Sequence, residues 1–203
     1  MMIIVDYGVG NLFSLRCSFG AVGQDVTVTG DADAIRRADK IVLPGVGAFG
    51  DAAQKLRERG LDQVLIDKAR AGTPLLGICL GMQLLFDRSL EYGEHPGLGL
   101  IPGTVRPMAG VIPADYKIPH IGWNALRFAR RDCPLFAGVR EGECVYFVHS
   151  FYAADCGGAL VASAEYGADL TAAVQRGNVF GCQFHPEKSG EVGAKILKNF
   201  CEM

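Results

Sequence analysis

The sequence carries almost no net charge, because 20 lysines and arginines nearly balance 22 acidic residues among its 203 residues. The formal charge is -2 at pH 7. Without a broad basic field, nucleic acid and anionic membranes are poor candidates for the main partner, although local basic patches remain compatible with this balance.

Long apolar runs are also missing. The longest, residues 75–86, is interrupted by Gln83 and two glycines and is too short to span a bilayer. The N-terminal segment has no basic region and reaches Asp6 after a few apolar residues, so it does not resemble a secretory signal peptide. We therefore expect a cytoplasmic protein.

Paired metal-binding and disulfide motifs are absent as well. The seven cysteines form no C-x-x-C pair, which argues against a disulfide framework or a zinc ribbon and favours a reducing compartment. None of the four histidines forms a metal-ligand pair such as H-E-x-x-H. We expect neither a metal nor a cofactor.

The first half of the chain alternates between apolar runs and amphipathic segments, which predicts an α/β fold with a mostly parallel central sheet flanked by helices. The expected strands cover residues 2–5, 25–29, 40–43 and 75–79; the expected helices cover 11–22, 31–37, 51–70 and 80 to about 88. Active groups should lie at the carboxyl ends of these strands.

The second half changes in character. Residues 97–119 are rich in glycine and proline and predict loops, and further strands are expected at 124–128, 144–151, 160–165, 171–176 and 179–184. These should add antiparallel strands on one side of the sheet. A helix should follow Ser189, and the length suits a single domain over residues 1–203.

Cys79 lies at the predicted junction of a strand and a helix. The spacing Gly77-x-Cys79-x-Gly81 repeats the G-x-S-x-G nucleophile elbow with sulfur in place of oxygen. If a helix begins near Leu80, its free N–H groups and positive end favour a thiolate and stabilise an oxyanion. The alternative is an ordinary buried cysteine.

A base for Cys79 is offered by His185-Pro-Glu187, which follows an apolar run. Pro186 ends the strand and favours a rigid turn, in which Glu187 could hold one imidazole nitrogen while the other faces Cys79. A structural histidine beside a surface glutamate is the alternative. The other three histidines, His95, His120 and His149, have no acidic residue two positions away.

A competing signal is the literal G-x-G-x-x-G of Gly45-Val-Gly47-Ala-Phe-Gly50, which follows a predicted strand and, taken alone, suggests a dinucleotide-binding protein. The acidic residue that should hold a ribose would be Asp62 or Asp67, and both fall inside a predicted helix. We interpret residues 44–50 instead as a loop whose N–H groups form an oxyanion hole beside Cys79.

The motifs Gly77-Ile-Cys-Leu-Gly-Met-Gln83 and Phe184-His-Pro-Glu187 resemble those of the class I (triad) glutamine amidotransferases. Further matching stretches run over essentially the whole chain and resemble the members that deliver ammonia to a separate cyclase subunit; they are Asp6–Asn11, Pro44–Phe49, Lys117–Asn124, Tyr146–Ser150 and His185–Ser189. The resemblance implies a glutaminase that forms a heterodimer with this cyclase.

The resemblance also implies roles for individual residues. Cys79 would form a γ-glutamyl thioester, His185 would carry the proton and Glu187 would orient His185. The remaining roles, carried over by position, are oxyanion donation by the backbone of Val46 and Leu80, glutamine binding by Gly47, Gln83, Ser150 and Phe151, and contact with the cyclase by Asn11, Trp123, Tyr146 and Lys188. Phe151 stands where the family often has tyrosine.

Two hypotheses from different classes therefore remain. One is a glutaminase that acts with a cyclase. The other, which depends on Gly45, Gly47 and Gly50 alone, is a non-catalytic dinucleotide-binding or scaffold protein.

Overall fold

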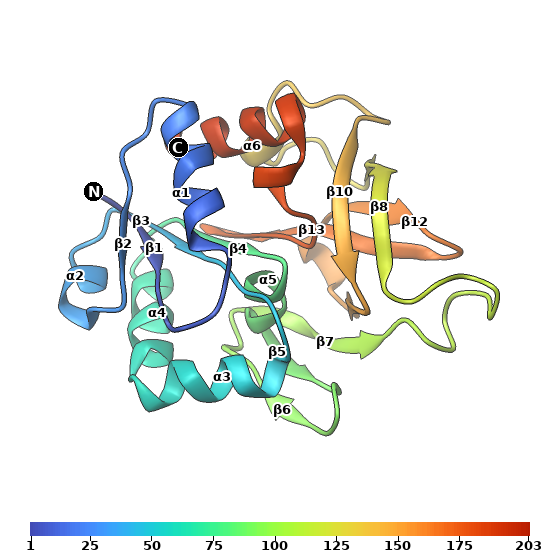
Figure 1. Cartoon of the computed structure of the whole chain (residues 1–203), viewed down its shortest axis with the longest axis horizontal. Helices are drawn as coiled ribbons and strands as arrows, with labels where there is room; N and C mark the ends of the chain where they lie inside the picture. Colours follow the sequence, from blue (N-terminus) through green and yellow to red (C-terminus); the bar gives the residue numbers. More distant parts are fainter.

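An eight-stranded sheet forms the centre of the computed structural model, which describes residues 1–203 (Figure 1). Its order is β2 (Thr27–Thr29), β1 (Met2–Val5), β3 (Lys40–Leu43), β4 (Leu75–Ile78), β14 (Val179–Cys182), β13 (Asp169–Arg176), β12 (Leu160–Glu165) and β9 (Arg127–Phe128). Pairing is parallel from β2 to β14 and antiparallel from β14 to β9. The expected mostly parallel sheet with antiparallel strands on one side is confirmed.

Helices cover both faces of this sheet. The helices α1 (Leu12–Ala21) and α6 (Gly190–Glu202) contact each other on one face. The helices α2 (Ala32–Arg36), α3 (Phe49–Glu58) and α4 (Leu61–Arg70) lie on the other (Figure 1). None of the helices has the length and apolar character needed to cross a membrane.

The side chains of β1 show why helices cover both faces of the sheet. Ile3 and Val5 belong to a core cluster with α3 and α4, whereas Met2 and Ile4 belong to a second cluster with α1 and α6. Successive side chains of a strand point to opposite faces, so a strand that is apolar throughout needs packing on both.

Two helix predictions were wrong in extent. The single helix expected over residues 51–70 is two helices, because Gly60 adopts a left-handed conformation (φ 63°) between them. The helix expected from residue 80 to about 88 is only α5 (Leu80–Leu84), and the chain continues as β5 (Phe86–Ser89). Pairing of β5 with two other strands overrides the local helical pattern.

The second half contains two small sheets that the sequence did not predict. β11 (Phe151–Ala154), β7 (Ile101–Pro107), β5 and β6 (His95–Pro96) form one of them, and β10 (Cys144–His149) pairs with β8 (His120–Ala125) in the other. The strand expected over residues 144–151 is therefore broken at Ser150. The strand expected over 124–128 is divided between β8 and β9, and the region expected as loops contains β7.

Candidate active site

Cys79 occupies a strained turn between β4 and α5. Its backbone has φ 55° and ψ -114°, a conformation that non-glycine residues rarely adopt. The glycines on either side serve close packing: a Cβ on Gly77 would lie 2.6 Å from the Gly81 carbonyl oxygen, and one on Gly81 would collide with the Leu43 carbonyl oxygen. The nucleophile elbow is thus present, with the strain on the cysteine itself.

The loop after β3 packs directly against this elbow. A Cβ on Gly45 would lie 2.8 Å from the Gly81 nitrogen and 2.9 Å from the Leu80 Cβ. The buried Tyr7 hydroxyl donates a 2.8 Å hydrogen bond to the Pro44 carbonyl oxygen and fixes the start of the loop. The loop and Cys79 are neighbours because β3 and β4 are adjacent parallel strands that end at the same edge of the sheet.

The start of α3 argues against a dinucleotide in the same loop. The Phe49 N–H, at the end of the helix where a phosphate would bind, donates a 2.7 Å hydrogen bond to the Glu91 carboxylate. Glu91 is 8% exposed. Gly50 packs against the His95 ring, from which its Cβ would lie 2.8 Å. A carboxylate already occupies the anion position, so the glycine pattern is explained without a nucleotide.

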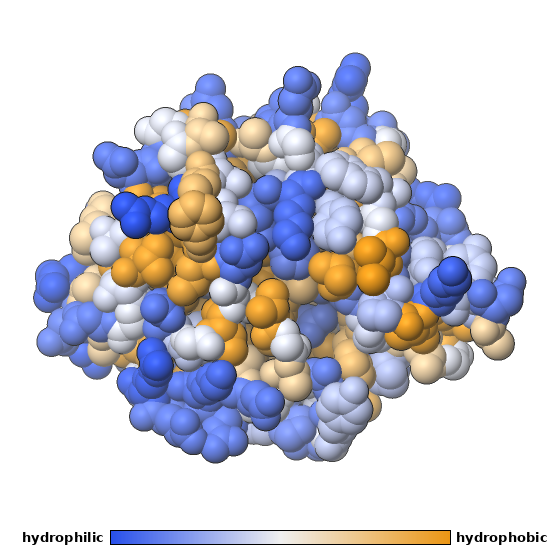
Figure 2. Space-filling view, in the orientation of Figure 1, coloured by the Kyte–Doolittle hydropathy of each residue, from blue (hydrophilic) through white to orange (hydrophobic).

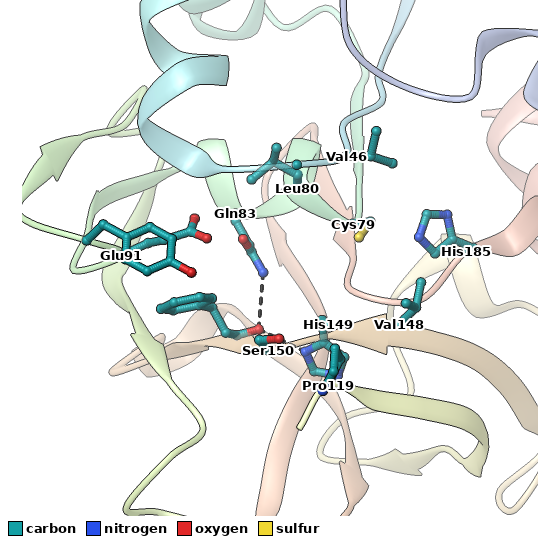
Figure 3. A pocket seen from close by; sticks show the side chains of 13 residues that line it. Val46, Cys79, Leu80, Gln83, Glu91, Pro119, Val148, His149, Ser150 and His185 are labelled. Carbon is teal, nitrogen blue, oxygen red and sulfur yellow. Dashed lines mark hydrogen bonds between the residues drawn. The ribbon is translucent and has the colours of Figure 1, made fainter. Parts of the chain in front are cut away.

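His185 and Glu187 form a buried pair in the turn that follows β14. The His185 Nδ1 lies 2.7 Å from the Glu187 Oε1, and their side chains are 5% and 4% exposed. The Nε2 of His185 has no hydrogen-bond partner, and its ring faces Cys79 (Figure 3). Burial lowers the pKa of His185, but the Cys79 sulfur and the Glu187 carboxylate outweigh burial and raise the pKa to about 10.

The His185 turn is fastened to β10 by two hydrogen bonds, and a third closes the turn itself. The His185 N–H donates to the Tyr146 carbonyl (2.9 Å), and the Tyr146 N–H donates to the Ser189 Oγ (3.0 Å). The Ser189 hydroxyl in turn donates to the His185 carbonyl (2.6 Å). The hydroxyl of Ser189 thus bridges the backbones of the histidine and of β10.

A cavity of about 330 Å³ lies in front of Cys79 (Figure 3). Eight of the predicted site residues line it, namely Val46, Gly47, Cys79, Leu80, Gln83, Ser150, Phe151 and His185. Glu187 does not line the cavity and lies behind His185. The structure therefore brings together the segments around residues 46, 79, 150 and 185, which are far apart in the sequence.

The cavity also contains residues that the sequence interpretation missed. Glu91 lies across the cavity from His185 (Figure 3), and no local motif marks it. The Phe151 ring packs edge-on against Tyr92, at 6.3 Å between centroids. This contact gives the phenylalanine a role in shaping the cavity that does not require a hydroxyl group.

Gln83 joins the far wall of the cavity to the elbow. Its Nε2 donates to the Phe151 carbonyl (3.1 Å; Figure 3) and to the Gln183 Oε1 (3.0 Å). The Nε2 of Gln183 lies 3.9 Å from the Cys79 Sγ. Gln183 was also missed, although a polar residue within the apolar run before His185 was a usable signal.

The residues expected at a partner surface are accessible to different degrees. Trp123 is 54% exposed, which rules out ordinary core packing, and its ring packs edge-on against the half-buried Tyr146 at 6.0 Å. The Lys188 Nζ lies 5.6 Å from the centre of the Tyr146 ring. Asn11 is exposed and its side chain caps α1 by accepting from the Ser14 N–H.

Apolar side chains are exposed near these residues. In Figure 2 apolar patches lie in a belt across the middle of the face, from the region of α1 to that of β8, and hydrophilic residues surround the belt. Exposed apolar residues in these elements and in the loops at the cavity are Phe13, Val46, Ile118, Ile121 and Trp123. Such a surface is typical of a protein–protein interface.

The family described as Glutamine amidotransferase class-I matches residues 3–203, and the chain belongs to that family. It is 50% identical over 201 residues to the imidazole glycerol phosphate synthase subunit HisH of Bacillus cereus, covering 98% of this chain and 93% of the relative. It is 47% identical over 207 residues to the HisH subunit of Syntrophotalea carbinolica, covering 100% of both. Within the family, the chain falls in the HisH group.

Solved structures agree on the fold. The structure of PurLQS from Thermotoga maritima matches with a TM-score of 0.78 at 22% identity, covering 99% of this chain and 97% of that one. A crystal structure described as a glutamine amidotransferase matches with a TM-score of 0.77 at 19% identity, covering 98% and 97%.

Proposed function

We propose that this chain is the glutaminase subunit of an imidazole glycerol phosphate synthase and acts in the cytoplasm in histidine biosynthesis. The whole chain, residues 1–203, forms one amidotransferase domain. It hydrolyses glutamine and passes the ammonia to a separate cyclase subunit, with which it forms a heterodimer. The observation that carries this proposal is the cavity that contains Cys79 and the buried His185–Glu187 pair, whose Nδ1 and Oε1 atoms are 2.7 Å apart.

The proposed reaction proceeds in two steps. The Cys79 sulfur attacks the side-chain carboxamide carbon of glutamine, the C–N bond breaks, and His185 gives its Nε2 proton to the leaving nitrogen, which departs as ammonia. Water then attacks the thioester while His185 accepts a proton from it. The C–S bond breaks, and glutamate is released.

The backbone N–H groups of Val46 and Leu80 are the proposed oxyanion donors. Support comes from the packing of Gly45 against Leu80 and Gly81, which sets the loop beside the elbow. Val46 is 43% exposed, so a docked partner can reach this loop. We expect the isolated chain to be a poor glutaminase, because the Val46 peptide completes the oxyanion hole only when the cyclase is docked with its nucleotide ligand.

Glutamine itself needs a site for its charged end as well as for its amide. Glu91 supplies a buried carboxylate whose Oε2 accepts from Phe49, which leaves Oε1 for the α-ammonium group. Gly47, Gln83 and the backbone around Ser150 and Phe151 complete the proposed binding site.

The proposed docking surface for the cyclase includes Asn11, Trp123, Tyr146 and Lys188. A large exposed aromatic residue is suited to anchor an interface, and Lys188 offers a cation next to the catalytic turn. The Tyr146 backbone is also hydrogen-bonded to His185 and to Ser189. A partner that contacts Tyr146 would therefore touch the residue that holds the proposed base in place.

Cys79→Ala tests the proposal. In the complex with the cyclase and its nucleotide ligand, this variant should release no glutamate from glutamine, while cyclisation with ammonium salts continues, because cyclisation takes place in the other subunit. Glutamate release by purified Cys79→Ala protein would reject Cys79 as the nucleophile. Full activity of the unpaired wild-type chain would favour an independent glutaminase.

A further inference from the structure

Two buried histidines without a role in the reaction lie between the cavity and the exposed face of β8. His149 ends β10, lines the cavity and is 6% exposed. His120 begins β8, is directly paired with His149 across the two strands and is 1% exposed. Burying two ionisable rings side by side is unfavourable unless their hydrogen bonds are satisfied.

The two rings belong to a hydrogen-bonded chain that ends in an acceptor on each side. The His149 Nδ1 lies 2.8 Å from the Phe151 carbonyl oxygen, which can only accept. The His120 Nε2 lies 2.8 Å from the Asn124 Oδ1, while the Asn124 amide donates to the Glu165 carbonyl (2.8 Å). Between the rings, the His120 Nδ1 lies 3.1 Å from the His149 Nε2.

Two neutral imidazole rings carry too few protons for all three of these hydrogen bonds. A neutral imidazole has one N–H, so the two protons are consumed at the Phe151 and Asn124 ends and two lone pairs then face each other in the middle. Turning the Asn124 amide over gives no solution, because its oxygen would then face the Glu165 carbonyl oxygen. Three hydrogen bonds require three protons.

We propose that His120 and His149 bind one proton beyond those of two neutral rings, and that the resulting link positions the Ser150–Phe151 edge of the glutamine cavity. The expected effect on the KM for glutamine rests on the proposed glutaminase function. Both histidines are positioning residues here, since the edge is held through the Phe151 carbonyl, which also accepts from Gln83 (3.1 Å).

The surroundings favour His120 as the ring that carries the charge. Its ring is stacked on Tyr166, at 4.0 Å between centroids, and on Phe147, at 5.0 Å, and aromatic faces stabilise a cation. On the other side, His149 and His185 line the same cavity. Burial, together with the charges of His120 and His185, lowers the pKa of His149 to about 4, against a weaker opposing effect of the Phe151 carbonyl, so His149 stays neutral.

No carboxylate forms an ion pair with His120. The Tyr166 hydroxyl donates to the Lys117 carbonyl, and the Glu165 carboxylate accepts from the Gly167 N–H. Burial lowers the pKa of His120 overall, and its hydrogen bond to Asn124 offsets this effect only in part. In the proposal, the third hydrogen bond and the two ring faces hold the proton against this shift, without a carboxylate counter-ion.

Loss of the proton has a defined structural consequence. Without the extra proton only two of the three hydrogen bonds can be kept. In the proposed response, His149 moves its proton from Nδ1 to Nε2 and donates to His120, whose hydrogen bond to Asn124 is kept. The Nδ1 lone pair of His149 then faces the Phe151 carbonyl oxygen, and the edge of the cavity loses one of its two fixed hydrogen bonds. A shift of the His120 proton to Nδ1, which would keep the Phe151 bond instead, would refute the positioning role.

Nitrogen-15 NMR of the histidine rings in the isolated wild-type chain, titrated from about pH 5 to about pH 9, tests the proton count directly. We expect His120 to lose one proton in this range while the His149 proton moves from Nδ1 to Nε2. A neutral His120 throughout, with one unchanged tautomer of His149, would overturn the proposal. This measurement needs neither a variant nor enzyme activity.

Two matched variants test the effect on glutamine in the complex with the cyclase and its nucleotide ligand. His120→Asn places an amide donor near the former Nδ1 and needs no added proton, whereas His120→Phe keeps the stacked ring without nitrogen. The wild-type KM for glutamine should rise about tenfold as the proton is lost, with a smaller change in kcat. The KM should be independent of pH in both variants, low in His120→Asn and high in His120→Phe.

The outcomes separate this inference from the proposed function. A wild-type KM that stays flat while the tautomer of His149 switches would refute the positioning role. An absence of glutamine hydrolysis under all conditions would refute the proposed function, and the NMR titration would still decide the proton count.

Discussion

Ser189→Ala is expected to impair catalysis by removing one of the two hydrogen bonds that hold the His185 turn to β10, together with the bond that closes the turn, although Ser189 does not line the cavity. The hydroxyl accepts from the Tyr146 N–H at 3.0 Å and donates to the His185 carbonyl at 2.6 Å, in a residue that is 1% exposed. Removal of one partner from a buried hydrogen bond costs about 1–3 kcal/mol. For two such bonds that share one hydroxyl group, we expect a loss of about 2–4 kcal/mol of unfolding free energy.

The catalytic consequence should be larger for kcat than for KM, since the hydroxyl holds the base and not the walls of the cavity. A displacement of a catalytic group by about 1 Å costs about 100-fold in rate, so we expect kcat to fall by about ten- to one-hundred-fold. Urea unfolding and glutamate release in the complex measure the two effects. Ser18→Ala, a partly exposed position on α1, is the control. Destabilisation with an unchanged kcat would refute a positioning role for Ser189.

The proposed roles lead to three further predictions. His185→Ala should lower the rate of glutamate release by at least about 10³-fold and Glu187→Gln by less, because only the first removes the proton carrier; the reverse order would exchange their roles. The pKa of His185 is raised to about 10, so its imidazolium is present at neutral pH. Iodoacetamide should therefore label Cys79 faster than the exposed Cys17 near pH 6.5. Slower labelling of Cys79 would contradict an activated thiolate. Trp123→Ala should weaken cyclase binding by about ten- to one-hundred-fold in a titration and leave the labelling of Cys79 unchanged; equal affinity would exclude Trp123 as an anchor.

The sequence predicted the central sheet well because its strands are buried on both faces. A strand such as β1 is apolar at every position and is followed by an amphipathic helix, and this pattern has few other solutions. The wrong predictions of helix extent came where a single residue, or pairing with a strand distant in the sequence, decides the local structure. Gly60 divides a helical pattern that is otherwise continuous, and β5 forms only because β6 and β7 pair with it.

The candidate site divides in the same way. Cys79, His185 and Glu187 were identifiable because a nucleophile elbow and a His-Pro-Glu turn leave local marks in the sequence. Glu91 leaves none, since its significance comes from the start of α3, which is 42 positions away along the chain. Ser189 was visible as part of a motif, but its bonds to β10 could be known only from the structure.

The distribution of the site over two sheets separates the reacting groups from the groups that a partner can reach. Cys79 and the His185 turn follow adjacent parallel strands of the large sheet, and the Cys79 N–H donates to the Cys182 carbonyl at 2.7 Å, so the nucleophile and the start of the turn are fixed to each other. The β8–β10 ribbon forms a sheet of its own and carries the exposed Trp123, the anchor of the His185 turn at Tyr146 and, just beyond β10, the edge of the cavity. A partner bound to this ribbon would therefore contact both the anchor of His185, the proposed base, and the edge of the proposed glutamine cavity, while the elbow remains fixed in the large sheet.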